Sequence, residues 1–145
     1  MATPNTNSKI WQALRERILT LPLPADMPIL WPARLKELPK EWCLEITHLV
    51  NRPGRVFIGS DAPHQRLGIL QIGLLTEINS KYDDQLSRLT ELAGNIADHF
   101  PTDLRMSYGG VSVRVTEAPE VATSFKDEKR SRIVTPVSVR WQAWA

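Results

Sequence analysis

The chain has 145 residues, with 18 lysines and arginines against 16 aspartates and glutamates. This length fits one domain, and a formal net charge of +2 is too balanced to indicate a nucleic-acid-binding protein from the totals alone. The single cysteine, Cys43, excludes an internal disulfide and a multi-cysteine metal site, and no apolar stretch approaches the roughly 20 residues of a membrane-spanning helix. We therefore expect a soluble protein of a reducing compartment, in which Cys43 is a small buried hydrophobe.

The chain is expected to begin with a flexible arm at residues 1–6, followed by a helix. Asn7 or Ser8 can cap its first turn. Apolar residues then recur at three- and four-residue steps, which predicts one buried stripe: Ile10, Trp11, Leu14, Ile18 and Leu21. Residues 22–40 contain five prolines and favour extended backbone, so the segment from Ile29 to Trp31 is predicted to be a short edge strand.

Two strands are predicted in the middle of the chain. Residues 42–50 alternate between apolar and other side chains, with Trp42, Leu44 and Ile46 on one face. Residues 51–64 form a loop in which Pro53 and Gly54 indicate a turn. Residues 66–76 are rich in apolar side chains compatible with a strand, and the two glycines among them suggest a bulge or a close backbone approach.

The strongest helical periodicity follows these strands. Its apolar members fall at offsets of 0, 3, 7, 10, 11 and 14: Leu86, Leu89, Ala93, Ile96, Ala97 and Phe100. Ser80 is the expected N-cap, Asp83 and Asp84 lie in the first turn, and Pro101 ends the helix.

The C-terminal part is predicted to be strands. Gly109 and Gly110 separate two strand-like segments, 104–108 and 111–116, which predicts a hairpin with a two-residue turn. The last strand runs from Arg132 to about Trp141, and Pro136 within it indicates an edge or a bulge. The predicted fold is α+β, a mostly antiparallel sheet with two α-helices packed on one face plus a β-hairpin, in a single domain spanning residues 1–145.

No catalytic constellation is visible in the sequence. His48, His64 and His99 fall in a strand, a loop and a helix end, without ligand-type spacing. Neither a nucleophile motif nor a phosphate-binding glycine loop is present. We therefore expect no enzyme activity, no metal and no cofactor.

The candidate contact residues lie in two basic stretches and at the C-terminus. The first stretch contains Arg52, Arg55 and Arg66, and the second contains Lys126, Lys129, Arg130 and Arg132. An apolar triplet inside the long loop 51–65 is more easily explained by a partner than by solvent. Both basic stretches suit phosphate contacts, although a solvated loop or a charged subunit seam explains each more simply. The candidates are Arg52, Arg55, Val56, Phe57, Ile58, Arg66, Lys126, Lys129, Arg130, Arg132 and Trp144. The proline-marked last strand and the strand near Ile29 also offer edges for strand addition.

Several short strings, together with the order of elements, resemble the tail-terminator and tail-completion proteins of long-tailed bacteriophages. The resemblance covers roughly residues 8–142. The strings are Gly68-Ile69-Leu70-Gln71-Ile72, Asp98-His99-Phe100-Pro101, Gly109-Gly110-Val111-Ser112-Val113-Arg114-Val115-Thr116 and Pro136-Val137-Ser138-Val139-Arg140-Trp141-Gln142.

The resemblance implies a virion protein that assembles with copies of itself, as a hexameric ring. Such a ring caps the finished tube of tail tube protein, ends tail polymerisation and presents a surface to the head-completion protein. It also implies assembly in the host cytoplasm, and DNA that passes through the lumen without sequence-specific contacts. Two alternatives stay open, a head–tail connector of the same particle and a monomeric nucleic-acid-binding module that uses the basic stretches.

Overall fold

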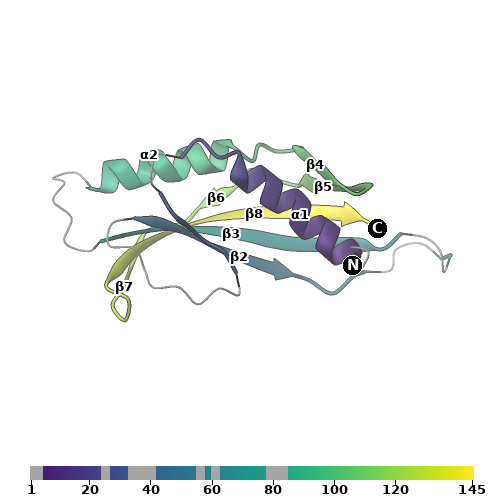
Figure 1. Cartoon of the computed structure of the whole chain (residues 1–145), viewed down its shortest axis with the longest axis horizontal. Coiled ribbons are helices and arrows are strands. Elements are labelled where there is room, and N and C mark those ends of the chain that lie inside the picture. The colour runs from purple at the N-terminus through teal and green to yellow at the C-terminus, as the bar shows by residue number, and fades with distance from the viewer. Residues whose placement is uncertain (1–4, 24–26, 33–41, 55–57, 60–62, 78–84) are drawn as a thin grey trace.

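The computed structural model describes residues 5–23, 27–32, 42–54, 58–59, 63–77 and 85–145, and confirms the α+β fold (Figure 1). Two helices are present, α1 (Thr6–Leu19) and α2 (Gln85–Asp98). The strands are β1 (Ile29–Leu30), β2 (Cys43–Val50), β3 (Gln65–Glu77), β4 (Arg105–Tyr108), β5 (Val111–Val115), β6 (Glu120–Val121), β7 (Phe125–Asp127) and β8 (Arg132–Trp144). They form one curled sheet in the order β1-β2-β3-β8-β5-β4, with β6 and β7 also paired to β8. All pairings are antiparallel except that of β1 with β2.

Helix α1 begins earlier than the sequence predicted. The side chain of Asn5 accepts a hydrogen bond from the Ser8 amide at 2.9 Å, which satisfies one of the free amides of the first turn. Asn5 is therefore the N-cap, and Thr6 already belongs to the helix. The predicted cap at Asn7 or Ser8 was wrong, and the last two residues of the predicted arm are part of this cap and helix.

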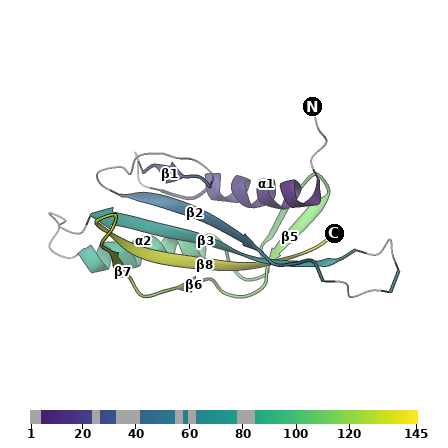
Figure 2. The same ribbon diagram turned by 90° about the horizontal axis from the view of Figure 1, so that it is seen from below.

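Strand alternation divides the sheet into two faces. Cross-strand partners share a face, and the register pairs Leu44 with Leu74, Ile72 with Val137, and Leu70 with Val139. This inner face packs against both helices in one core (Figures 1 and 2). The helices contribute to it Ile10, Ala13, Leu14 and Ile18 from α1 and Leu89, Ala93 and Ile96 from α2. The predicted cap residues Ser80, Asp83 and Asp84 and the side chain of Leu86 lie outside the described residues.

The opposite side of β2, β3 and β8 is called the outer face here. It holds a small second core of Cys43, Leu75 and Val134, against which Leu30 packs. Burial raises the pKa of the Cys43 thiol, with Glu45 acting in the same direction. Cys43 is thus a buried, neutral side chain, as its apolar surroundings in the sequence predicted.

Strand β8 is central, so its predicted edge position was wrong. It pairs with β3 along its whole length on one side and with β5, β6 and β7 on the other. The carbonyl of Pro136 accepts from the Ala122 amide at 2.9 Å, so the ring nitrogen also faces the β6–β7 side. Strand β6 covers Val137 and Ser138, and β7 stops opposite Val134. The missing donor of Pro136 therefore falls at the break between two short strands: the proline cannot return the bond that Ala122 makes to it, and the pairing of β6 ends there.

The other strand predictions were confirmed. Strand β1 is a two-residue edge strand, and β4 and β5 form the predicted hairpin. Gly109 and Gly110 adopt φ angles of 56° and 84°, the left-handed conformation that a two-residue hairpin turn requires. Strand β4 is the other edge of the main strand order.

Candidate partner-contact surface

The outer face is exposed and apolar at the end where β8 finishes. Leu49 of β2, Leu67 of β3 and Trp144 of β8 are 51%, 37% and 42% exposed. The register places Leu49 beside Ile69, Leu67 beside Gln142, and Gln65 beside Trp144. These side chains share one face because residues two apart on a strand point to the same side. The alternation in β2 and β3 therefore creates an apolar patch that neither helix covers.

The connection between β2 and β3 extends this end of the sheet. Gly54 and Gln65 exchange two backbone hydrogen bonds of 2.8 Å, and His64 and Ala145 exchange two of 3.1 Å. The base of the connection is thereby fixed to the C-terminus. Its described residues project beyond the end of β8, and the side chain of Ile58 is 93% exposed (Figure 2). Arg52 is exposed too, whereas the predicted contacts Arg55, Val56 and Phe57 lie outside the described residues.

Arg66 makes its contacts within the subunit. Its Nε donates to the backbone carbonyl of Ala145 at 3.3 Å, and its Nη1 donates to Oδ1 of Asn7 at 3.0 Å. The side chain therefore ties the C-terminus to the first turn of α1. Sequence reasoning grouped Arg66 with Arg52 by proximity along the chain, but the two arginines have different surroundings.

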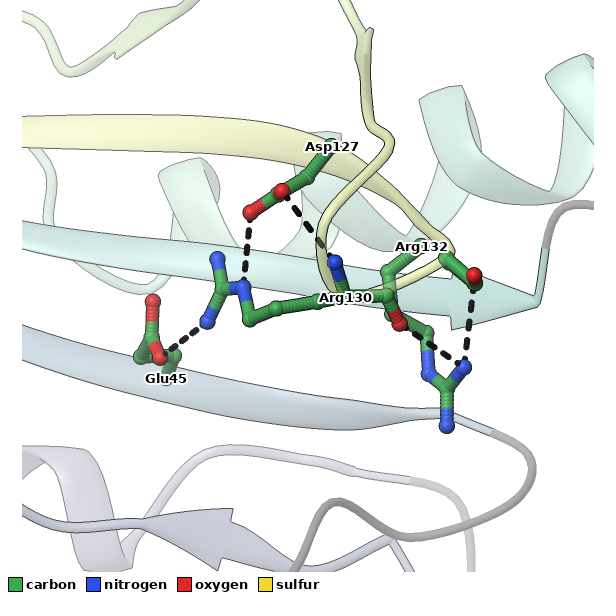
Figure 3. A network of polar contacts seen from close by, with 5 residues as sticks. Glu45, Asp127, Arg130 and Arg132 are labelled. Carbon is green, nitrogen blue, oxygen red and sulfur yellow. Dashed lines mark hydrogen bonds and ion pairs between the residues drawn. The ribbon is translucent and has the colours of Figure 1, made fainter.

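The second basic stretch also contains an arginine whose side chain contacts other groups of the same subunit. Arg130, in the turn between β7 and β8, donates from Nε to Asp127 at 2.7 Å and from Nη1 to Glu45 on β2 at 2.6 Å (Figure 3). Its side chain extends across β3 to reach Glu45 on β2 (Figure 3). Hydrogen bonding to Arg130 lowers the pKa of Asp127, and the bond to Glu45 raises the pKa of Arg130. Arg130 thus fixes the β7–β8 turn over the outer face.

The remaining candidates of this stretch have other environments. Arg132 donates from Nη1 to the carbonyls of Arg130 and Ser131, at 3.3 and 3.0 Å. Lys126 and Lys129 are exposed. The two basic stretches are not brought together, because one lies at the C-terminal end of β8 and the other at its N-terminal end. Twelve residue steps of strand separate these ends, roughly 40 Å.

A row of aromatic rings on the inner face was not predicted as a unit. The ring of His48 lies between Trp11 and Trp141, with centroid distances of 5.5 and 5.4 Å. Trp31 meets Trp11 edge-on at 6.2 Å, and the guanidinium of Arg15 stands 5.2 Å from the Trp31 ring. The row joins α1, the β1 region, β2 and β8. Strand alternation puts His48 on the same face of β2 as Leu44 and Ile46, but its adjacency to Trp141 depends on the pairing of β2 and β8 through β3.

The titratable group of this row is the imidazole of His48, which is in its neutral form. Burial lowers the pKa of His48, and its Nε2 is buried with no hydrogen-bond partner among the residues that the structure describes. Within the described ranges, no three histidine, cysteine, aspartate or glutamate side chains gather as a metal site would require. None of the described helices is long and apolar enough to cross a membrane. The notable surface among the described residues is therefore the apolar end of the outer face.

The chain is similar to known proteins in its fold and in its family sequence pattern. No curated protein matches the sequence. One solved structure superposes with a TM-score of 0.74 over 97% of this chain and 96% of its own, at 17% identity, which is a likeness of fold alone. The family model described as phage tail terminator protein matches residues 9–141, nearly the whole of the domain. The chain therefore belongs to the phage tail terminator protein family, a structural family of the virion tail.

Proposed function

We propose that this protein ends the growing phage tail by assembling as a ring, with six-fold symmetry, on the last layer of the tail tube. The ring stops addition of further tube protein and presents its other surface to the head-completion protein. Family membership supports the tail role. The single structural observation that supports assembly is the apolar end of the outer face, where Leu49, Leu67 and Trp144 are exposed together.

The geometry favours a binding role over chemistry. The aromatic row holds its one histidine among rings, and Arg66 and Arg130 contact groups of the same subunit. A nucleic-acid-binding monomer would gather basic side chains on one face. Here the exposed Lys126 and Lys129 lie at the opposite end of β8 from the exposed Arg52. DNA contact is therefore proposed only as a weak, sequence-independent property of an assembled lumen.

Electron microscopy with mass measurement tests the proposal. The purified protein is imaged alone at high concentration and after mixing with purified tail tubes. We expect six-fold rings or discrete caps at one end of each tube, and tubes capped in this way should not elongate when tube protein is added. The absence of rings and of caps under both conditions would refute the proposed function. A salt-dependent complex between monomer and duplex DNA, without rings, would support the nucleic-acid reading instead.

A further inference from the structure

The β4–β5 hairpin, at the C-terminal end of β8, turns two arginines and two serines away from the core (Figure 1). Its inner side chains are buried: Met106, Val111, Val113 and Val115. Because side chains alternate between the two sides of a strand, the intervening ones lie on the outer face. Cross-strand pairing places Arg105 opposite Arg114 and Ser107 opposite Ser112, and Arg114 lies beside Gln142 of β8.

The two arginines occupy a closely spaced cross-strand pair. A two-residue hairpin turn is closed by a hydrogen-bonded pair, here Tyr108 and Val111, and the type of pair alternates along an antiparallel ladder. Arg105 and Arg114 are therefore a pair of the other type, whose Cα atoms lie only about 4.5 Å apart. Like charges directly opposite one another repel. An anion held between the two guanidiniums removes this repulsion.

The hairpin face is rich in hydrogen-bond donors that the subunit does not use. Neither β4 nor β5 contains an acidic residue. Within the described part of the chain, the side chains of Arg105, Ser107 and Ser112 make no hydrogen bond or ion pair. Arg114 donates from Nη1 to the exposed carboxylate of Asp103 at 2.7 Å, which is one of the five N–H donors of a guanidinium. Most donors of this face are therefore available to a ligand.

The charges around the hairpin leave Arg105 without a carboxylate. Arg140 of β8 lies on the same face and pairs with Glu117 at 3.2 Å, as Arg114 pairs with Asp103. Two of the three arginines are thus neutralised by exposed carboxylates. Two further charges of opposite sign flank the hairpin: Lys9 of α1 beside its turn and Glu120 of β6. The remaining positive charge is that of Arg105, which is exposed on the edge strand β4.

We propose that the outer face of the β4–β5 hairpin binds the phosphate groups of a nucleic-acid backbone, with Arg105 and Arg114 on either side of one phosphate. Planar guanidinium forks match phosphate oxygens, and contacts of this kind do not read base sequence. Two guanidiniums and the hydroxyls of Ser107 and Ser112 offer more donors than the two oxygens of one carboxylate accept. The inference rests on the proposed function for the ring, in which several copies of this weak site act on one DNA molecule.

Fluorescence anisotropy of a short labelled DNA duplex, measured over a range of salt concentrations, tests the site. The logarithm of the affinity falls with the logarithm of the salt concentration by about 0.9 for each phosphate contacted. Arg105→Gln should weaken binding and reduce this slope by about 0.9. The control is Lys126→Gln, an equal loss of charge on an exposed residue of β7, and it should bind like the parent protein. Circular dichroism confirms that both variants fold. Equal effects in the two variants would overturn the proposal.

Asp103→Asn should change binding in the opposite direction. The substitution releases Arg114 from its carboxylate, so DNA binding should tighten and the salt slope should become steeper. Asparagine tolerates the left-handed backbone of position 103, where φ is 68°, so the fold is kept. The control is Glu128→Gln, the same change in charge in the turn between β7 and β8. An equal gain in both variants reports net charge alone and would count against the site, as would no gain in Asp103→Asn.

The source of the anion is decided by NMR on the parent protein. Inorganic phosphate should shift the backbone amide signals of β4 and β5 and compete with DNA, whereas glutamate at the same ionic strength should not. Phosphate shifts without DNA binding would assign the site to free phosphate, and equal shifts with glutamate would indicate an acidic protein partner. Either result overturns the nucleic-acid assignment.

Failure of this inference is distinguishable from failure of the proposed function. If rings or tube caps form and Arg105→Gln binds DNA like the parent protein, the hairpin site is wrong and the proposed function stands. If neither rings nor caps form, the proposed function fails, and the salt slopes of the single subunit still decide whether the hairpin binds phosphate.

Discussion

The indole ring of Trp141 on β8 lies over Gly68 on β3, so closely that a Cβ atom at position 68 would stand 2.3 Å from Cζ2 of the ring. The same atom would lie 2.6 Å from the carbonyl oxygen of Leu49 on β2. The absence of a side chain at this position lets the indole cross β3 and contact the ring of His48. A close approach of backbone and ring thus accounts for one of the two glycines in β3.

Gly68→Ala is expected to destabilise the protein by about 2–3 kcal/mol or more, because the backbone of Leu49 cannot move aside as a flexible side chain would. Urea unfolding measures the change. Gly73→Ala is the matched control on the same strand, since a Cβ there would meet its nearest neighbours at 3.5 Å or more, ordinary contact distances. Equal stability loss in both variants would contradict the proposed role of the indole.

Stability is expected to fall as the pH falls below neutrality, in part through His48. Burial lowers its folded-state pKa below the ordinary value of 6.5. The unfolded chain therefore binds this proton first, and the free energy of unfolding decreases as the pH drops through 6.5 until the lowered folded pKa is passed. His99 acts in the same direction, because burial and then the charge of Arg17 lower its pKa.

His48→Phe separates this contribution from the rest. Phenylalanine keeps a ring between Trp11 and Trp141 and removes both the titration and the unpaired Nε2. Urea unfolding of the parent and the variant at pH 7.5 and pH 5 should show a smaller loss of stability in the variant. An unchanged pH dependence would show that His48 does not titrate differently in the folded and unfolded states.

Arg17→Lys is expected to destabilise the protein by about 1–2 kcal/mol, although it keeps the charge. The Nε and Nη2 atoms of Arg17 both donate to the carbonyl of His99, at 3.0 and 2.7 Å, and join the end of α1 to the residue after α2. A lysine cannot supply this fork of donors. Arg15→Lys is the control, because an ammonium can still stand over the Trp31 ring. Thermal unfolding of both variants provides the comparison.

Arg130→Gln is expected to raise the pKa of Asp127 toward its ordinary value of 3.8, since hydrogen bonding to Arg130 is the main cause of the lowered pKa. In the parent protein the stabilising contribution is present above that value and is lost as the pH falls through the lowered folded pKa. Carboxyl-carbon NMR titration follows Asp127 directly. Lys129→Gln, in the same turn, should leave the titration unchanged. The loss of stability should be small, because water screens these partly exposed ion pairs.

Local patterns were sufficient for most of the fold. The hydrophobic period of α2, the alternation of β2 and the paired glycines of the β4–β5 turn each depend on residues close in the sequence. Such signals act through backbone geometry and are visible in one chain. They failed at Pro136, because a missing donor indicates an edge only when both neighbouring strands are continuous. The gap between β6 and β7 is a property of the assembled sheet.

The candidate surface depended more on tertiary structure. The sequence by itself determined that this is an α+β domain, which residues of each strand share a face, and the resemblance to tail terminators that the family match confirms. Only the tertiary structure decided that Arg130 reaches Glu45, 85 positions away, and that the exposed Leu49, Leu67 and Trp144 share the outer face at the end of β8. The physical reason is that alternation assigns a side chain to a face, whereas strand order and register decide which face is covered and which neighbours it has.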